Sequence, residues 1–213
     1  MASSTKLAKY YTADRPEFVN FAKKQGTFSH AIDIGCAGGR LGGDLITAGV
    51  LERCDGIEPN PDAAALARQT LNEVWSGSFE ANASVVPWER YDLLIMADVL
   101  EHLVDPWSAL RQLREVSRPT CRLMLSVPNI RHYKVLLPLL FRGEFGYRDH
   151  GIMDRTHLHF FTASSIEDTL SECGWKMVLR SSHMKSSYRR RLMPTRMLEP
   201  FVAVQYLMTA EKR

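Results

Sequence analysis

Apolar residues along the chain fall into short continuous runs, and between these runs the apolar positions repeat every three or four residues. Runs of this length predict buried strands, and the longer period predicts amphipathic helices. Strands are expected at residues 29–35, 53–59, 73–79, 91–97 and 121–128. Helices are expected at about 16–24, at 60–71 and at 105–117. A further helix is expected after the turn that follows the first strand, and it ends at about residue 48. Strands that alternate with helices predict a parallel sheet with right-handed crossovers.

The alternation breaks after Pro128, where an apolar helix-like piece, VLLPLLF, and the histidine-rich sequence DHGIMDRTHLHFFT follow. A helix is expected again near 164–173, and two final strands in 175–182 and 201–209. We therefore expect a helical cap over residues 1–27 and one α/β domain over residues 28–213. This domain carries an insertion at about 129–162.

A glycine-rich turn follows the first expected strand, in the sequence DIGCAGGRLGG. Five of the 13 glycines of the chain stand there, at Gly35, Gly38, Gly39, Gly42 and Gly43. Glycine permits positive φ and lets a ligand approach the backbone closely. A strand that ends in such a turn and leads into a helix is the usual nucleotide-binding corner of a doubly wound sheet. The next strand ends in Glu58, about twenty residues on, where a carboxylate can accept hydrogen bonds from a ribose diol.

The turn departs from the dinucleotide pattern G-x-G-x-x-G, because position 37 is alanine. This departure argues against a nicotinamide-dependent oxidoreductase. The turn opens instead with Asp33, whose carboxylate can hold a cationic amino group. Asp33 before the turn and Glu58 after the second strand suit a ligand with an ammonium at one end and a ribose at the other. S-adenosylmethionine is such a ligand.

Four segments resemble motifs of the class I S-adenosylmethionine-dependent methyltransferases. AIDIGCAGG is similar to the first motif of that family and GIEPN to the second. YDLLIMADVLEHLVDPWSAL and RLMLSVPN are similar to the fourth motif and the one after it. The resemblance covers roughly residues 28–182. It implies a Rossmann-like, doubly wound α/β fold, with a seven-stranded sheet in the order 3-2-1-4-5-7-6 and an antiparallel last strand.

The resemblance also implies which residues hold the cofactor. The methionine part would be lined by Gly35, Cys36, Ala37 and Gly38, with Asp33 before them. Glu58 would bind the ribose and Pro59 would lie at the edge of the adenine. Ser78 and Phe79 stand where many relatives carry an aspartate for the adenine amine. Ala97, at the end of the fourth strand, would lie beside the sulfonium.

The sequence ADVLEHLVDP follows the fourth strand directly and places Asp98, Glu101 and His102 within five residues. On a helix these positions share one face. In sheets of this kind, ligands bind at the carboxyl ends of the central strands. The three side chains are therefore expected near the transferred methyl group. They could complement a helix dipole, supply a general base, or hold a metal.

The acid-x-x-Glu-His run is similar to that of the ubiquinone-pathway O-methyltransferases and the small-RNA 2′-O-methyltransferases. In the RNA enzymes a later histidine before an aromatic-Thr sequence completes a metal site, and His157 stands in the matching place. The resemblance thus implies Asp98, Glu101, His102 and His157 as catalytic residues and metal ligands. Carboxylates suit magnesium, and imidazoles add manganese, iron and zinc. Without a metal, His102 or His157 is the expected general base.

Composition narrows the functional classes. The chain has 213 residues, of which 45% are hydrophobic and 24% are charged, as in globular proteins. The net charge of +3 argues against a nucleic-acid partner, although RNA 2′-O-methylation stays an alternative. The 4 cysteines form no CxxC pair, which favours the reduced thiols of a cytoplasmic protein. We expect neither a signal peptide nor a transmembrane segment. No pattern indicates an oligomeric state.

These observations predict an enzyme that transfers a methyl group from S-adenosylmethionine to a hydroxyl of a small molecule or glycan, with N-methylation as an alternative. The segment KVLLPLLF, 134–141, is expected to form a lid packed on the active site. His159 is expected to be a packed core histidine. The basic segment YRRRLMPTR, 188–196, is interpreted as a solvated face or as a contact for a substrate phosphate or carboxylate.

Overall fold

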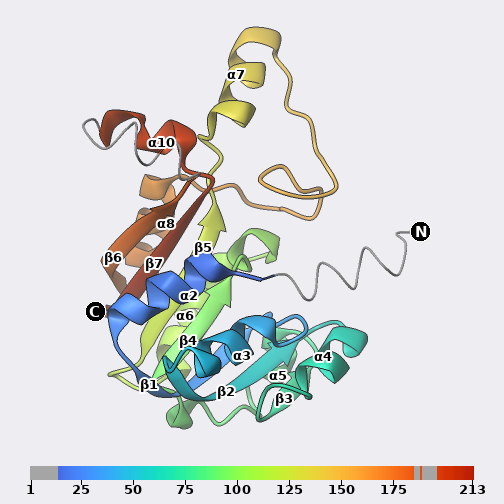
Figure 1. Cartoon of the computed structure of the whole chain (residues 1–213), viewed down its shortest axis with the longest axis vertical. Coiled ribbons are helices and arrows are strands. Elements are labelled where there is room, and N and C mark those ends of the chain that lie inside the picture. Colours follow the sequence, from blue (N-terminus) through green and yellow to red (C-terminus); the bar gives the residue numbers. More distant parts are fainter. Residues whose placement is uncertain (1–13, 185–187, 189–195) are drawn as a thin grey trace.

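Seven strands form one sheet in the order β3-β2-β1-β4-β5-β7-β6 (Figure 1). The computed structural model describes residues 14–184, 188 and 196–213. The strands are β1 Phe28–Ile34, β2 Leu51–Glu58, β3 Val74–Ser76, β4 Leu93–Ala97, β5 Arg122–Pro128, β6 Trp175–His183 and β7 Gln205–Lys212. Strands β1 to β5 pair in parallel, and β7 is antiparallel to both of its neighbours. The sheet order that the sequence resemblance implies is therefore confirmed.

Several helices begin where the sequence offers a side-chain cap. The helices are α2 Pro16–Ala22, α3 Arg40–Thr47, α4 Pro61–Ala67, α5 Phe79–Asn82, α6 Pro106–Val116, α7 Tyr133–Arg142, α8 Ala163–Glu172 and α10 Glu199–Val202. Short 3-10 turns occupy η1 Lys23–Gln25, η2 Trp88–Arg90, η3 Leu100–His102 and η4 Arg196–Leu198. The side chains of Asn60 and Asp105 accept hydrogen bonds from the first free amides of α4 and α6. Proline follows each cap, where its missing N–H costs nothing.

Helices cover both faces of the sheet, and each face has its own apolar core. On one face α2, α3 and α4 pack on alternate residues of the central strands, among them Ala31, Leu93 and Ile95. On the other face α6 and α8 pack on the intervening residues, such as Ile32 and Leu94. The central strands are buried on both faces, which explains why their sequences are continuous apolar runs.

Three boundaries differ from those that the sequence predicts. Strand β3 ends at Ser76 because Gly77 adopts a φ of 120° and Ser78 caps the following helix. Helix α4 ends at Ala67 rather than near residue 71. The last strand begins at Gln205, since the residues before it form α10.

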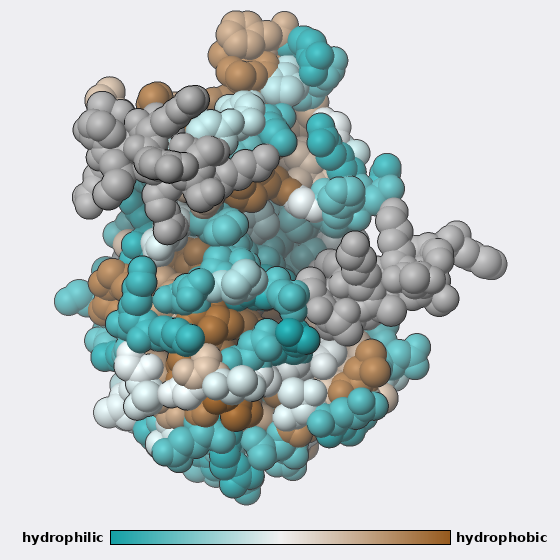
Figure 2. Space-filling model, in the orientation of Figure 1, coloured by the Kyte–Doolittle hydropathy of each residue, from teal (hydrophilic) through white to brown (hydrophobic). Residues whose placement is uncertain are grey.

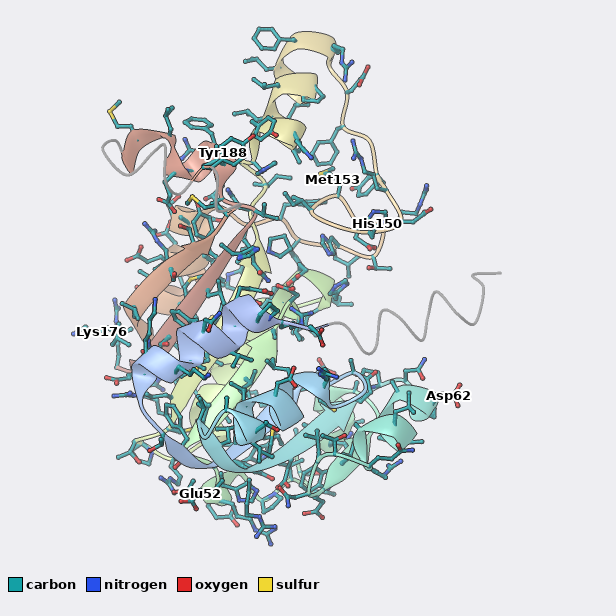
Figure 3. The ribbon with its side chains drawn as sticks, in the orientation of Figure 1. Glu52, Asp62, His150, Met153, Lys176 and Tyr188 are labelled. Atoms are coloured by element: carbon teal, nitrogen blue, oxygen red, sulfur yellow. The ribbon has the colours of Figure 1, made fainter. Side chains whose placement is uncertain are left out.

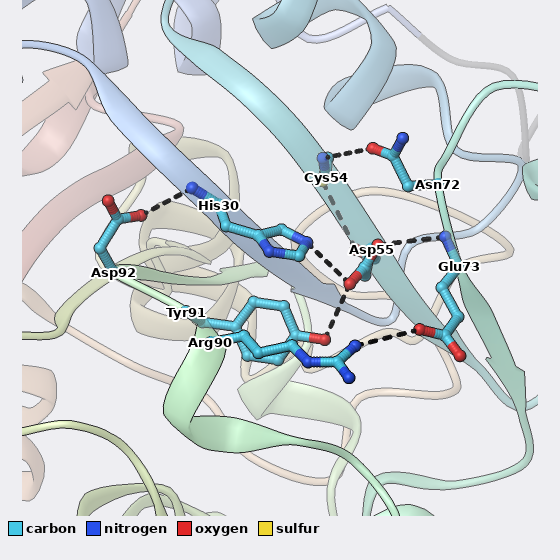
Figure 4. A network of polar contacts seen from close by, with 8 residues as sticks. All are labelled: His30, Cys54, Asp55, Asn72, Glu73, Arg90, Tyr91 and Asp92. Atoms are coloured by element: carbon cyan, nitrogen blue, oxygen red, sulfur yellow. Dashed lines mark hydrogen bonds and ion pairs between the residues drawn. The ribbon is translucent and has the colours of Figure 1, made fainter.

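A polar network around the buried Asp55 fastens β2 to its neighbours (Figure 4). The Asp55 carboxylate lies 2.8 Å from Nε2 of His30 and accepts a hydrogen bond of 2.9 Å from the Tyr91 hydroxyl. It also accepts a bond of 3.1 Å from the Glu73 amide. Asp92 accepts from the backbone amide of His30. These contacts fix the register of β1 and β2, whose carboxyl ends carry the site described below.

The two ends of the segment 129–162 meet beside the sheet. The Ile130 amide donates to the Phe161 carbonyl, and the buried Asn129 side chain donates to two carbonyls around α10. Between these ends, α7 projects beyond the carboxyl ends of the strands (Figure 1). Its Leu140 and Phe141 side chains are 67% and 76% exposed, and brown apolar atoms gather at this tip of the molecule (Figure 2). Helix α7 therefore lies largely off the sheet, and Val135 is its one buried residue. Its expected role as a lid over the active site stays a prediction.

Parts of two predicted segments lie outside the described residues. They are residues 1–13 of the expected cap and Arg189, Arg190 and Arg191 of the basic segment. Helix α2 is the described part of that cap, and its two phenylalanines pack on the sheet. None of the described helices combines the length and apolar character needed to cross a membrane.

Candidate active site

The glycine-rich turn sits at the carboxyl end of β1, in the middle of the sheet. Amides of Gly35 and Cys36 both donate to the Ile57 carbonyl of β2, at 2.8 and 3.1 Å. Gly35 has a φ of 77°, and a Cβ built there would lie 2.8 Å from a methyl group of Val99. Only glycine fits this position without strain, and the turn therefore lets a ligand approach the backbone closely.

Asp33 lies in β1 just before the turn and is 2% exposed. Its Oδ1 atom has no hydrogen-bond partner among the described residues. Burial raises the pKa of this carboxyl to about 7, although Arg15 acts to lower it. A buried carboxylate without a partner is costly, and a ligand ammonium would remove that cost. The position thus suits the amino group that the sequence analysis assigned to it.

Glu58, the last residue of β2, reaches across to the turn. One of its carboxylate oxygens accepts from the Ala37 amide and the other from the Asn60 amide, both at 2.8 Å. Glu58 therefore ties the glycine-rich turn to the start of α4, with Pro59 beside it. A ribose diol would approach the same two oxygens at this strand end.

Ser78 and Phe79, the two residues expected near the adenine, have different surroundings in the structure. The Ser78 hydroxyl accepts from the Ala81 amide at 3.3 Å as the cap of α5. The Phe79 ring is 4% exposed and lies edge-on to Trp88, with ring centroids 5.7 Å apart. The core thus takes up the Phe79 ring, so the expected contact between that ring and adenine is not supported.

Asp98 follows Ala97 at the end of β4 and has a φ of 58°. Its Oδ1 accepts hydrogen bonds from the Ser126 hydroxyl at 2.8 Å and from the Gln205 amide. Its Oδ2 pairs with Arg15 at 2.5 Å. The left-handed backbone and these three donors hold Asp98 apart from the two residues with which it was expected to share a helix face.

Glu101, His102 and His157 do come together, although His102 and His157 lie far apart in the sequence. Each offers one ligand atom, and these atoms lie within 4.8 Å of one another. Glu101 is 1% exposed, and both of its carboxylate oxygens lack partners among the described residues. Burial, together with the charge of Asp98, raises the pKa of Glu101 well above its usual value. A bound cation or a proton would stabilise a carboxylate in these surroundings.

Backbone carbonyls orient the two imidazoles of this group. The Nδ1 atom of His102 lies 3.2 Å from the Thr156 carbonyl, and that of His157 lies 3.0 Å from the Ile152 carbonyl. A carbonyl can only accept, so each Nδ1 carries the proton and each Nε2 keeps its lone pair. Burial and the neighbouring His157 lower the pKa of His102, which favours its neutral form.

The comparison with protein families decides the family of the chain. Residues 7–180 match the family model described as a methyltransferase domain, which is most of the chain. The chain belongs to this methyltransferase family. The chain is also 31% identical over 132 residues to a ubiquinone biosynthesis O-methyltransferase of Aeromonas salmonicida, which is 58% of this chain and 53% of that protein. The match thus spans about half the length of this curated relative.

Solved structures of methyltransferases share the fold. A SAM-dependent methyltransferase from Archaeoglobus fulgidus aligns with a TM-score of 0.67 and 15% identity, over 99% of this chain and 100% of that one. A second one, from Clostridium acetobutylicum, aligns with a TM-score of 0.66 and 11% identity, over 98% of both chains. The fold of this family member is therefore that of the class I S-adenosylmethionine-dependent methyltransferases.

Three residues that hold the site of this methyltransferase were missed by the sequence analysis. They are Arg15, Ser126 and Gln205, which all contact the Asp98 carboxylate. Arg15 lies 83 residues before its partner, and no periodicity or spacing in the sequence marks it. The Ser126 position at the end of a buried apolar strand is the one available signal, because a polar residue there faces the ligand edge of the sheet.

The remaining histidines of the insertion lie outside the group. The His159 ring packs edge-on to Trp107 at 5.3 Å, and its Nε2 lies 3.2 Å from the Val104 carbonyl. It is half-buried at the surface of the core rather than within it. Arg155 is exposed and pairs with Asp149 at 2.9 Å.

Proposed function

We propose that this methyltransferase transfers the methyl group of S-adenosylmethionine to a hydroxyl oxygen of a small molecule or sugar. The observation that carries the proposal is the buried, unpartnered Asp33 oxygen beside a glycine-rich turn, with Glu58 on the other side of that turn. This spacing of two acids suits a ligand with an ammonium and a ribose. The similarity to a ubiquinone biosynthesis O-methyltransferase supports oxygen as the acceptor atom.

The chain would act mainly by holding the two reactants in line. Asp33 and Glu58 would fix the two ends of the donor, so that its methyl group faces the space beyond Ala97. Bringing donor and acceptor to near-attack distance removes much of the entropic barrier to transfer. The acceptor hydroxyl must also lose its proton, and when no metal is bound Nε2 of His102 or His157 would take it.

We further propose that Glu101, His102 and His157 hold a divalent metal such as magnesium, manganese, iron or zinc. Two facts support the fit of these residues. The Glu101 carboxylate is buried without a partner, and both imidazoles have Nδ1 directed at a carbonyl, as metal-ligating histidines usually do. When bound, such a metal lowers the pKa of an acceptor hydroxyl. Asp98, held by Arg15, would remain outside this ligand set and position the strand end.

A ligand-binding experiment tests the methyl-transfer proposal. S-adenosylmethionine and S-adenosylhomocysteine should each raise the thermal midpoint of the chain, since ligands stabilise the state that they bind, whereas NADH should not. Asp33→Asn should abolish most of the shift, while Asp62→Asn, an exposed acid on α4, should leave it intact. A panel of sugars, phenols and amines with labelled donor would then identify the acceptor. No shift with either sulfur ligand would rule the proposal out.

The metal is tested separately. Elemental analysis should find a divalent metal in the purified chain, and Glu101→Gln should remove it while keeping the side-chain shape. His159→Gln is the matched control, because this histidine is close in sequence yet lies outside the group. If EDTA and Glu101→Gln leave activity unchanged, the metal proposal is wrong, and a histidine base would remain for the methyl transfer.

A further inference from the structure

A cavity of about 630 Å³ lies beside α7 and is also lined by the segment that follows this helix. In the side-chain view, His150, Met153 and Tyr188 are found around this region, beyond the carboxyl ends of the strands (Figure 3). The cavity is large enough for a ring-bearing metabolite, since small-molecule sites usually measure about 300–1,000 Å³.

The charged side chains that line the cavity are mostly cationic. They are Lys134, Arg142, Arg148 and a single acid, Glu144. Glu144 pairs with Arg142 at 2.9 Å, so these two charges neutralise each other. Within the described part of the chain, neither Lys134 nor Arg148 forms an ion pair. The cavity therefore carries two uncompensated positive charges.

Aromatic rings connect this cavity to the methyl-transfer site. The His157 ring lies 6.3 Å from that of Phe160, which in turn lies 6.2 Å from Tyr147 in the cavity wall. The His157 ring also reaches the wall directly through its contact with the carbonyl of Ile152. The cavity is therefore adjacent to His157, with Phe160 and Ile152 between them.

We propose that this cavity is the acceptor subsite and that it selects an acceptor carrying an anionic group, a phosphate or a carboxylate, in addition to its reacting hydroxyl. Lys134 from the first turn of α7 and Arg148 from the segment after this helix hold the anion. The faces of Tyr133 and Tyr147 hold the ring or chain that joins the anion to the hydroxyl. Its role as an acceptor site rests on the proposed methyl transfer, but its preference for anions does not.

Titration calorimetry with three probes tests the subsite. Phenyl phosphate, benzoate and benzyl alcohol share one ring and differ in charge, and each is added to the chain saturated with S-adenosylhomocysteine. At least one anionic probe should bind about tenfold or more tightly than the alcohol, because charge-assisted bonds are the stronger ones. Whichever anion binds more tightly identifies the anionic group. Equal affinity of the alcohol and both anions would overturn the proposal.

Two variants test whether the anionic probe binds in the cavity. Arg148→Gln and Lys134→Gln should each weaken the anionic probe by about fivefold or more, as expected for partly solvated charge pairs. Both side chains are exposed, so neither change should disturb folding. Lys176→Gln is the control, since Lys176 is an exposed cation on β6 far from the cavity (Figure 3). An unchanged affinity in both cavity variants would refute the assignment.

The titration of S-adenosylhomocysteine alone separates the two proposals. If it binds while the anionic probes do not, the subsite is wrong and the methyl-transfer proposal stands. If it fails to bind while the probes bind with the expected dependence on Arg148, the anion subsite stands and the proposed function is wrong.

Discussion

Replacing Asp33 with Asn should stabilise the ligand-free chain and weaken its binding of S-adenosylmethionine. The Asp33 carboxyl is 2% exposed, and burial raises its pKa from 3.8 to about 7. Because the folded-state pKa lies above the unfolded one, the folded chain keeps this proton between about pH 4 and pH 7 while the unfolded chain releases it. The contribution of Asp33 to the free energy of unfolding therefore falls as the pH rises across this interval.

The size of the effect follows from the same pKa. Each tenfold change in proton affinity corresponds to about 1.4 kcal/mol, so the ionised Asp33 costs the folded chain about 4 kcal/mol above pH 7. This is a large part of the 5–15 kcal/mol or so that stabilises a typical domain. Asn carries no such charge. Asp33→Asn should therefore raise the free energy of unfolding by most of this amount at about pH 8 and by little at about pH 4.

Urea unfolding of the wild type and Asp33→Asn at a series of pH values measures this difference, with Asp62→Asn as the exposed control. The gap between the two proteins should widen from about pH 4 to pH 7 and then stay constant. Saturating S-adenosylhomocysteine should narrow it, because its ammonium stabilises the ionised Asp33 only in the wild type. A gap that is independent of pH would show that Asp33 is not the buried titrating group inferred here.

Three further changes test other parts of the structure. Glu58→Ala should weaken S-adenosylhomocysteine binding by about tenfold or more in calorimetry, since bonds to charged groups contribute about 1.5–3 kcal/mol. Gly42→Ala should lower stability to urea by about 1–3 kcal/mol, because its new Cβ would lie 2.6 Å from Leu71; an unchanged midpoint would contradict the tight packing of α3 on that side chain. Tyr91→Phe removes the hydroxyl that donates to Asp55 and should cost about 1–3 kcal/mol in the same assay, whereas no loss would mean that this bond contributes nothing net.

The sequence predicts the central strands well because their positions depend on local patterns, whereas the order of the sheet follows from the family resemblance. Each central strand is an apolar run that ends at a polar or glycine residue, so β1, β2, β4 and β5 were placed within two residues of their bounds. The errors lie where a local conformation overrides a pattern. The 120° φ of Gly77 ends β3 early, and α10 takes residues that look strand-like by composition.

The candidate site was predicted only as far as its parts lie close in sequence or match a family motif. Asp33 and Glu58 stand at strand ends, which adjacent parallel strands necessarily bring together. The resemblance located His157, since nothing in the spacing alone connects it to Glu101. The conformation of Asp98 depends on donors from three distant segments. Asp98 has a left-handed backbone, and the 3-10 turn η3 begins only at Leu100, so Asp98 does not share a helix face with Glu101 and His102.

The tight packing around the glycine-rich turn has a consequence for thiol chemistry. The Cys36 sulfur fills the space next to Gly56, where a Cβ would lie only 2.5 Å away, and burial raises the pKa of this thiol. Burial also raises the pKa of the other three cysteines, all of which are free. Since the thiolate is the reactive form, alkylating reagents and mild oxidants should react slowly with the native chain. A cysteine introduced at the exposed tip of α7 would therefore accept a spectroscopic label selectively, without removal of the native ones.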